Sequence, residues 1–347
     1  MLRKIFAFDH CVRNVNDAAW IATSGYVVSR YNASTGKPLI IDSNGALTST
    51  TGTSTSAATI AGISFDQFLV PNPTKIVIGF RHKTLVAGAT GNFVALGPDI
   101  GFSTAGWVLD YSLLPTAAKA VGAEIYLEFE IDFTANTLAI SGDGLLLSSV
   151  ALTAVSTAAY IATMKTGKIS LFFSLTLSGG TNLCSIRDMY ILDNIAGDGI
   201  VARLGSVSTY PVYADEATAT PTAWAGSDGT TNMLTTLTAA QPATATVDSP
   251  TDKSPLKLSL KANTPEGFKI NAVQLMASVI AKGNNATLAK IEVTQGGTTV
   301  QAGNLTVPKT QAYGSTIATL PTAPAGGAWD ASKIDGTVIT ITPDVTG

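Results

Sequence analysis

The chain has 347 residues, of which 46% are hydrophobic, enough for one large buried core or two moderate ones. Only 13% are charged, the net charge is −3 and no cluster of Lys and Arg occurs, which argues against an electrostatic nucleic-acid partner. No uncharged apolar run approaches about 18 residues, so no membrane insertion is expected, and Asp9 and His10 interrupt the N-terminal apolar stretch too early for a secretory signal.

Small residues take the place that charged residues have in most soluble domains. A soluble domain usually carries about 25% charged residues, and here Thr, Ser, Ala and Gly take much of that share. Disordered chains combine low hydrophobicity with high charge, which is the opposite of this composition. A surface with few charges is typical of a protein that neighbouring subunits partly cover, so the composition favours an assembly.

The first predicted strands are short. They are expected at residues 5–9, 25–31 and 37–41, with polar loops between them. Because Pro38 has no backbone N–H to donate, the third of these strands is expected at a sheet edge. Residues 48–59, TSTTGTSTSAAT, are predicted to form an exposed loop.

The next block gives the clearest strand signal. Strands are expected at 74–82, 92–96, 106–111 and 124–133. In the last of them, EIYLEFEIDF, apolar residues occupy every second position, and Glu and Asp lie among the other positions. A period of two with one apolar face indicates a strand half-buried against a second sheet, so a β-sandwich is predicted.

Two hairpins and two short helical turns follow. Strands 137–141 and 145–152 are predicted to meet at Gly142-Asp143-Gly144, because an Asp-Gly pair favours a tight turn. Strands 169–177 and 185–192 are predicted to pair with each other around Gly179-Gly180, and to end at Asp193-Asn194 in a turn. Helical periodicity is limited to 115–121 and 156–162.

A change in composition near residue 195 predicts a domain boundary. Residues 196–251 are rich in Ala, Thr, Ser and Pro and are expected to form an extended arm, ordered mainly by neighbouring subunits. More ordered sequence resumes after it, with strands expected at 256–262, 269–281, 287–295, 298–307 and 336–342.

The N-terminal pattern resembles the concanavalin A-like (laminin G-like) jelly-roll sandwich. The resemblance is carried by EIYLEFEIDF, by the turns at 136–138 and 142–144, and by FFSLTLSGGTNLCSIRDMYILDN. The ending DMYILDN, followed by Arg203-Leu204-Gly205 and residues 207–211, is similar to a junction in tailed-bacteriophage virion proteins. Further similarities are Trp224, the step at residues 271–274 and Trp329-Asp330 before the terminal strand.

The resemblance implies an all-β chain, with a concanavalin A-like β-sandwich at 1–195 and an extended arm plus a smaller β-domain for assembly contacts at 196–347. It implies a non-enzymatic structural component of a tailed-phage virion (tail, baseplate, collar or head decoration), assembled in the host cytoplasm. Its partners would be other virion proteins and further copies of itself, with a trimer among the arrangements. No cofactor is expected.

The alternative function is a carbohydrate-binding receptor-adhesion protein on the virion surface. Exposed loop aromatics near one rim would then contact a host glycan, and Trp107 and Tyr111 are the candidates. A place in the core is the competing interpretation for Trp107.

Catalytic and metal sites have weak candidates only. Glu128 and Glu130 lie on the same side of one strand, and retaining glycosidases place two carboxyl groups about 5–5.5 Å apart. Aromatic residues that would stack on sugar make up only 7% of the chain, so a solvated outer strand face is the favoured interpretation. Calcium could use oxygens from Asp99, Asp110, Asp188, Asp193 and Asn194, but no Asp-rich binding loop occurs.

The histidines and cysteines indicate no active site. His10 and His82 have no nucleophile in a recognisable context. Cys11 and Cys184 form no CxxC pattern and are expected to be buried reduced thiols, with one long-range disulfide as the alternative.

Overall fold

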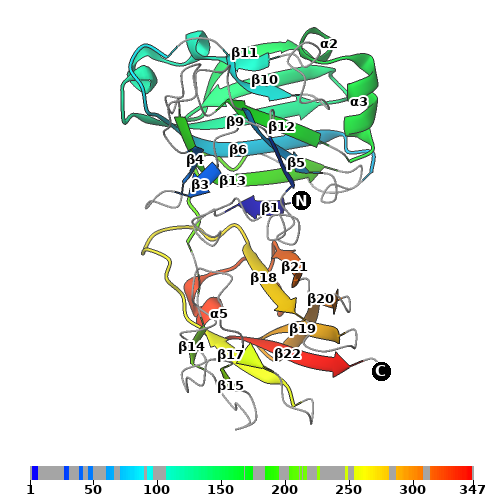
Figure 1. Ribbon diagram of the computed structural model, residues 1–347. Helices are drawn as coiled ribbons and strands as arrows, with labels where there is room; N and C mark the ends of the chain where they lie inside the picture. Colours follow the sequence, from blue (N-terminus) through cyan, green and yellow to red (C-terminus); the bar gives the residue numbers. More distant parts are fainter. Residues whose placement is uncertain are drawn as a thin grey trace. The chain divides into compact units, whose positions relative to one another are not determined.

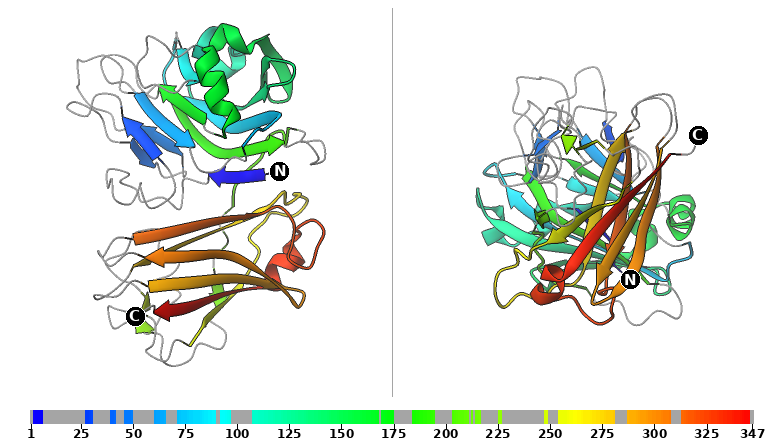
Figure 2. Two further views of the ribbon diagram at one scale, coloured as in Figure 1. Left: turned by 90° about the vertical axis from the view of Figure 1, so that its right-hand side faces the viewer. Right: turned by 90° about the horizontal axis from the view of Figure 1, so that it is seen from below.

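The computed structural model describes residues 2–6, 27–30, 39–41, 46–49, 60–65, 71–89, 92–96, 107–167, 169–174, 184–194, 203–210, 212, 214–216, 225–226, 247–248, 254–280, 287–307 and 313–345. The chain divides into two compact units between Thr209 and Tyr210. Figures 1 and 2 show the strands that make up each unit.

Two antiparallel sheets form the first unit. The larger contains β1 (Leu2–Phe6), β3 (Leu39–Ile41), β4 (Leu47–Ser49), β6 (Lys75–Thr84), β9 (Glu124–Asp132), β10 (Thr137–Gly142), β11 (Leu145–Ala151) and β13 (Cys184–Asn194). Its order is β11-β10-β9-β6-β13-β4-β3, and β1 also pairs with β13. The smaller contains β2 (Val27–Arg30), β5 (Ile60–Phe65), β7 (Asn92–Leu96), β8 (Trp107–Asp110) and β12 (Ile169–Ser174), in the order β2-β5-β12-β7-β8.

The apolar faces of the two sheets pack against each other. On β6 and β9, Ile78, Phe80 and Phe129 are buried, and the Phe80 and Phe129 ring centroids lie 5.6 Å apart. His82 on β6 contacts Phe93 on β7 of the smaller sheet, with ring centroids 4.8 Å apart. Burying each of these large side chains contributes about 1.5–3 kcal/mol. The predicted sandwich is therefore confirmed.

The β10–β11 hairpin forms as its turn sequence predicts. Asp143 and Gly144 have φ angles of 45° and 83°, the positive values that a two-residue type I′ turn requires. Asp143 also exchanges two hydrogen bonds with the backbone of Tyr126, through its own N–H (2.8 Å) and through Oδ1 (2.9 Å). These bonds fix the turn against the start of β9.

Four short helical segments form in the first unit: η2 (Tyr111–Leu113), η3 (Thr116–Lys119), α2 (Leu152–Val155) and α3 (Ala158–Lys165). Two of them, η3 and α3, match the predicted helical turns at 115–121 and 156–162. Thr157 caps α3 by accepting a hydrogen bond from the backbone N–H of Tyr160 at 3.2 Å. None of the helices in the described part of the chain has the length and apolar run of a membrane span.

The second predicted hairpin is wrong. β12 pairs with β5 and β7 in the smaller sheet, whereas β13 pairs with β6, β4 and β1 in the larger one. The chain therefore crosses from one sheet to the other between these strands. The sequence of two apolar runs around glycines does not tell which distant strands will pair with them. Here, pairing with distant strands replaces pairing of the two runs with each other. Asp193 and Asn194 also differ from the prediction, because they end β13 and are not in a turn.

Other differences concern strands rich in small or polar residues. β4, β5 and β21 (Tyr313–Leu320) are not predicted, and Thr48 and Ser49 of the expected loop belong to β4. β3 does lie at the end of its sheet, as expected for an edge strand after a proline.

The second unit is a smaller all-β structure. Its larger sheet has β14 (Ala214–Glu216), β17 (Leu256–Leu260), β22 (Thr337–Val345), β19 (Thr287–Gln295) and β20 (Thr298–Val307), in that order. β18 (Val273–Ile280) pairs with β21, and β15 (Ala225–Gly226) pairs with β16 (Val247–Asp248). Figure 2 shows the orange to red strands of this unit side by side.

Trp329 and the short helix α5 (Ala331–Asp335) complete the core of the second unit. The Trp329 side chain is buried, and its indole N–H donates to the carbonyl of Leu320 at 2.8 Å. Asp330 caps α5 by accepting from the backbone N–H of Lys333 at 2.9 Å. An all-β chain with a sandwich followed by a smaller β unit, as the sequence predicts, is thus confirmed.

Candidate functional site

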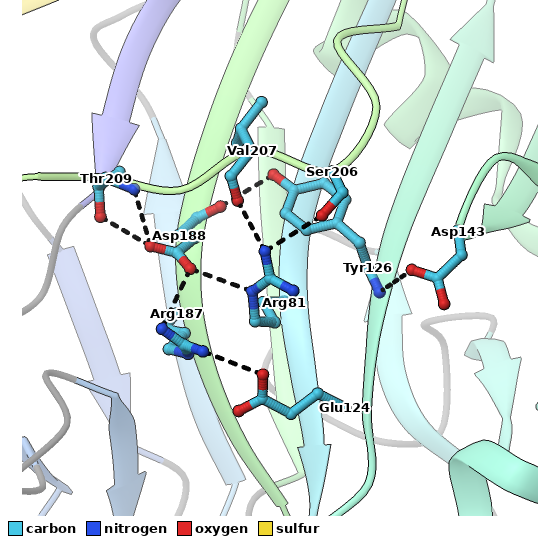
Figure 3. A network of polar contacts seen from close by, with 9 residues as sticks. All are labelled: Arg81, Glu124, Tyr126, Asp143, Arg187, Asp188, Ser206, Val207 and Thr209. Carbon is cyan, nitrogen blue, oxygen red and sulfur yellow. Dashed lines mark hydrogen bonds and ion pairs between the residues drawn. The ribbon is translucent and has the colours of Figure 1, made fainter. Parts of the chain in front are cut away.

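A cluster of polar and aromatic side chains lies on the outer face of the larger sheet, the face turned away from the sandwich core. It comes from β6, β9 and β13, where the residues that alternate with the core residues point outward. Figure 3 shows part of it. Its central members are Arg81, Tyr126, Glu128, Asp188 and Tyr190.

Gly79 makes room for the Tyr190 ring. Gly79 on β6 lies between Tyr190 on β13 and Glu128 on β9. A Cβ atom on Gly79 would lie only 2.2 Å from Cε1 of Tyr190, so the missing side chain lets the ring cross β6. The Tyr190 hydroxyl then donates to Oε1 of Glu128. The ring also stacks on Tyr126, with centroids 6.3 Å apart and planes 14° apart.

Asp188 sits at a β-bulge in β13 with a φ of 51°. Its buried carboxylate accepts from Nε of Arg81 at 3.2 Å, and from the backbone N–H and hydroxyl of Thr209 at 2.9 and 2.8 Å. The Arg81 guanidinium also donates to the Ser206 hydroxyl (3.1 Å) and the Val207 carbonyl (3.0 Å), as Figure 3 shows. Arg81 and Asp188 therefore bind the stretch of chain from Ser206 to Thr209.

We call residues 203–209 the strap. At its start, Arg203 donates to the Ser141 hydroxyl on β10. The backbone N–H of Leu204 donates to the Tyr190 hydroxyl at 3.1 Å, and that of Gly205 donates to Oε1 of Glu128 at 3.0 Å. The donors of the strap thus meet buried acceptors on the sandwich itself, and the expectation that neighbouring subunits order the arm stays a prediction.

The strap also corrects the interpretation of Glu128. Its side chain was expected on a solvated strand face, but it is only 2% exposed because Tyr190 and the strap cover it. Glu130 lies nearer the surface and pairs with Lys75 at 2.8 Å, and this hydrogen bond raises the pKa of Lys75. The two carboxylates thus hold different structural partners, which favours a structural role over a catalytic pair.

Burial keeps the tyrosines of the outer face protonated. It raises the pKa of Tyr126 and Tyr190 above the ordinary tyrosine value, and the bond to Glu128 raises that of Tyr190 further. The Tyr126 hydroxyl donates to the backbone carbonyl of Asp188 at 2.9 Å. Both phenols therefore act as hydrogen-bond donors that fix the bulge and Glu128.

Of the two glycan candidates, Tyr111 does not lie at an exposed rim. Tyr111 is 1% exposed, and its ring centroid lies 4.4 Å from that of Phe93 and 5.8 Å from that of His82, inside the sandwich. The sequence did not reveal this burial, because Tyr111 comes directly after a strand and begins the short helix η2, which places the ring in the core. Trp107 begins β8, opposite Ala95, and its side chain lies outside the described part of the structure.

The described histidine and cysteine are core residues. Burial lowers the pKa of His82 to about 3, so the ring is neutral, and Nε2 lies 3.3 Å from the Tyr111 hydroxyl. Cys184 is a buried thiol that forms no disulfide, and burial raises its pKa to about 12, which makes it unreactive. His10 and Cys11 lie outside the described residues.

Two of the candidate calcium ligands, Asp110 and Asp188, have other roles. Asp110 caps η2 by accepting from the backbone N–H of Ser112 at 2.6 Å, and Asp188 binds the strap. Asp193 is fully buried on β13, and Asp99 lies outside the described residues. In the described ranges, no group of three or more His, Cys, Asp or Glu side chains is arranged to hold a metal ion.

No protein-family model matches the chain, and no curated protein matches it. Solved structures that it resembles include lectin II from Ulex europaeus, at 12% identity over 56% of this chain and 100% of that chain, with a TM-score of 0.31. Another is arcelin-5, a lectin-like defense protein from Phaseolus vulgaris, at 12% identity over 55% of this chain and 98% of that chain, with a TM-score of 0.33. A sialidase has 9% identity over 55% of this chain and 18% of that chain, with a TM-score of 0.35.

Likenesses this distant carry no assignment of function, and none of them points to a phage virion. The all-β fold rests on the sheets themselves, and the function has to be inferred from this chain's own residues.

Proposed function

We propose that this chain is a non-enzymatic structural component of a tailed-phage virion, acting through contacts with further copies of itself and with other virion proteins. The proposal places it in the tail, baseplate, collar or head decoration, after assembly in the host cytoplasm. The observation that carries it is an apolar surface at one end of the sandwich.

Four of the six exposed large hydrophobic side chains among the described residues lie at this end: Leu113, Val121, Leu145 and Leu146. Leu145 and Leu146 follow the β10–β11 turn, which is bonded to the start of β9. Val121 precedes Gly122, whose N–H donates to the last residue of β6, Thr84, at 2.8 Å. Antiparallel β6 and β9 bring these segments to the same end, which we call the apolar end.

Exposure at the apolar end is high. Val121, Leu145 and Leu146 are 60%, 72% and 65% exposed, respectively. Exposed apolar side chains that gather in one region mark contact sites between proteins more often than singly scattered ones do. In a chain with only 13% charged residues, such a surface supports subunit contacts through apolar side chains.

Light scattering on the purified chain, at several concentrations, tests the self-association. We expect oligomers in the unchanged protein and a shift toward monomer in Leu146→Lys, with Lys257→Glu, an exposed position on the second unit, as the control.

Immuno-electron microscopy of particles from a lysate of the host tests the virion location. Antibody that labels no particle would refute it.

Carbohydrate binding on the virion surface is the second candidate function, and one observation supports it. Tyr210 and Phe268 in the second unit are 38% and 57% exposed, and their ring centroids lie 6.1 Å apart at 72°. Exposed aromatic rings can stack on the apolar faces of sugars. A glycan array with the unchanged chain and with Phe268→Ala tests it, since loss of a signal in the variant alone is the expected result. An array without any signal would remove this candidate.

A further inference from the structure

The strap is bound to the outer face as a peptide ligand would be bound. Its backbone donates through Leu204, Gly205 and Thr209 and accepts through Val207. The groups that receive it come from β6, β9 and β13, with Ser141 added from β10. Four strands thus contribute to the recognition of seven consecutive residues.

The receiving groups are held in place by contacts that do not involve the strap. Gly79 and Tyr126 confine the Tyr190 ring, and the Tyr126 hydroxyl holds the backbone at Asp188. Arg187 lies on the other side of Asp188, with Nη1 at 3.5 Å from its carboxylate. The site is therefore formed by the sheet, and its shape does not depend on the strap.

The site also requires an occupant. Glu128 and Asp188 are only 2% and 4% exposed, and backbone N–H groups of the strap supply part of their hydrogen bonds. A buried acceptor that loses its donor costs about 1–3 kcal/mol, and more when it is charged. Because the strap itself covers these carboxylates, its removal exposes them to water, and another segment that presents N–H groups at the same positions can take its place.

We propose that the outer face of the larger sheet is a peptide-recognition site that the strap of a second copy can fill, so that neighbouring copies become linked by strap exchange. The contacts are the same whether the strap comes from the same chain or from another. The effective concentration of each strap at the site then decides which one binds. For a strap on a short tether to its own sheet, this concentration is on the order of millimolar. The strap of another copy reaches the same value where copies are held side by side.

The position of the strap suits an exchange. The chain divides between Thr209 and Tyr210, so the strap is the last segment of the first unit and is covalently followed by the second. An exchanged strap would link one copy's sandwich to another copy's second unit. The inference rests on the proposed self-association, for which it names a second surface besides the apolar end.

Cross-linking between two single-cysteine variants tests the exchange. In a Cys11→Ser background, where Cys184 is buried and protected, Ser141→Cys marks the site and Arg203→Cys marks the strap. The two proteins are unfolded, refolded together at about 10 µM and at about 1 mM, to bracket the tether's effective concentration, and treated with a short bifunctional maleimide. The expected result is a covalent heterodimer whose yield rises at least several-fold with concentration.

Two controls define the outcomes. One chain that carries both Ser141→Cys and Arg203→Cys must cross-link within itself, which establishes that the variants fold with the strap on the site. Arg203→Cys mixed with Ala162→Cys, an exposed position on α3, whose last residue accepts a hydrogen bond from Asn72 before the start of β6, must give no heterodimer. If the double variant closes internally while the mixed single variants give no heterodimer at either concentration, strap exchange is wrong. An oligomer seen by light scattering would in that case still support the proposed function through the apolar end.

Discussion

At the residue scale, the closest packing on the outer face is that of the Tyr190 ring over Gly79. We predict that Gly79→Ala lowers the free energy of unfolding by about 1–3 kcal/mol, because the new methyl group overlaps the ring and forces it away from Glu128. Denaturant unfolding measures this. Gly336→Ala is the control, since its Cβ would lie 3.4 Å from the nearest atom, an ordinary contact.

A double-mutant cycle separates this overlap from a general preference for glycine in the strand. In a Tyr190→Ala background the ring is absent, so Gly79→Ala should cost far less there than in the unchanged protein. Equal costs in the two backgrounds would mean that the ring does not depend on Gly79.

His82 gives the sandwich core a pH dependence. Burial lowers its pKa to about 3 in the folded chain, against about 6.5 when unfolded. Between these values the unfolded chain binds one more proton, so the contribution of neutral His82 is complete above about pH 6.5 and is lost progressively as the pH falls toward 3.

We therefore predict that His82→Gln flattens the dependence of the unfolding free energy on pH. Below about pH 6.5 the slope should fall by up to about 1.4 kcal/mol per pH unit, the effect of one proton. Unfolding curves at several pH values between neutral and mildly acidic measure it. The carboxylates contribute equally to the pH dependence of the unchanged protein and of His82→Gln, so the difference between the two slopes reports His82 alone. Parallel pH profiles of the two proteins would contradict a buried neutral His82.

At the element scale, the strap depends on the charge of Asp188. We predict that Asp188→Asn, which tolerates the positive φ of the bulge, destabilises the first unit by about 1.5–3 kcal/mol because Arg81 loses its charged acceptor. Hydrogen exchange at Thr209 should accelerate as well. Glu124→Gln is the matched control, since the Glu124–Arg187 pair is about one-third exposed and should contribute under about 1 kcal/mol.

The edge strands of the two sandwich sheets are poorly suited to pairing with another chain. β3 has three residues, and β2 and β8 have four each. The longer edge β11 carries an extra residue that bulges the ladder. Short or bulged edges resist pairing with another chain. Subunit contacts of the first unit are therefore expected through the apolar end and the strap.

Local patterns in the sequence predict the elements that depend on local chemistry. The alternation in residues 124–133 identifies β9, and Asp143-Gly144 identifies the hairpin that follows, because period and turn geometry are properties of a few neighbouring residues. The partners of β12 and β13 could not be predicted. Both are apolar runs, and only the folded chain decides that one joins β5 and β7 while the other joins β6.

The site was missed for the same physical reason. Glu128 was expected on a solvated strand face and Asp188 was considered as a calcium ligand, because the segment that buries both lies 77 and 21 residues further along the chain. The stretches DMYILDN and Arg203-Leu204-Gly205 are the ones that meet, through the Tyr190 hydroxyl and the backbone N–H of Leu204. Sequence spacing alone gave no reason to bring them together.

At the scale of the whole molecule, the limit of the first unit can be tested directly. Composition places the boundary near residue 195, whereas the compact unit extends to Thr209 and includes the strap. We predict that a fragment of residues 1–209 is more stable to denaturant than a fragment of residues 1–195 by at least about 2 kcal/mol. The shorter fragment leaves Glu128 and Asp188 without the backbone donors that they have in the full chain.

A synthetic peptide of residues 201–211 makes this comparison specific. Added to the 1–195 fragment, it should raise the denaturant midpoint in proportion to its occupancy, since a ligand that binds only the folded state stabilises it by mass action. The same peptide should have little effect on the 1–209 fragment, whose site is already filled. Equal stability of the two fragments would mean that the strap lies on the sandwich without supporting it, and the buried carboxylates would then need another source of hydrogen bonds.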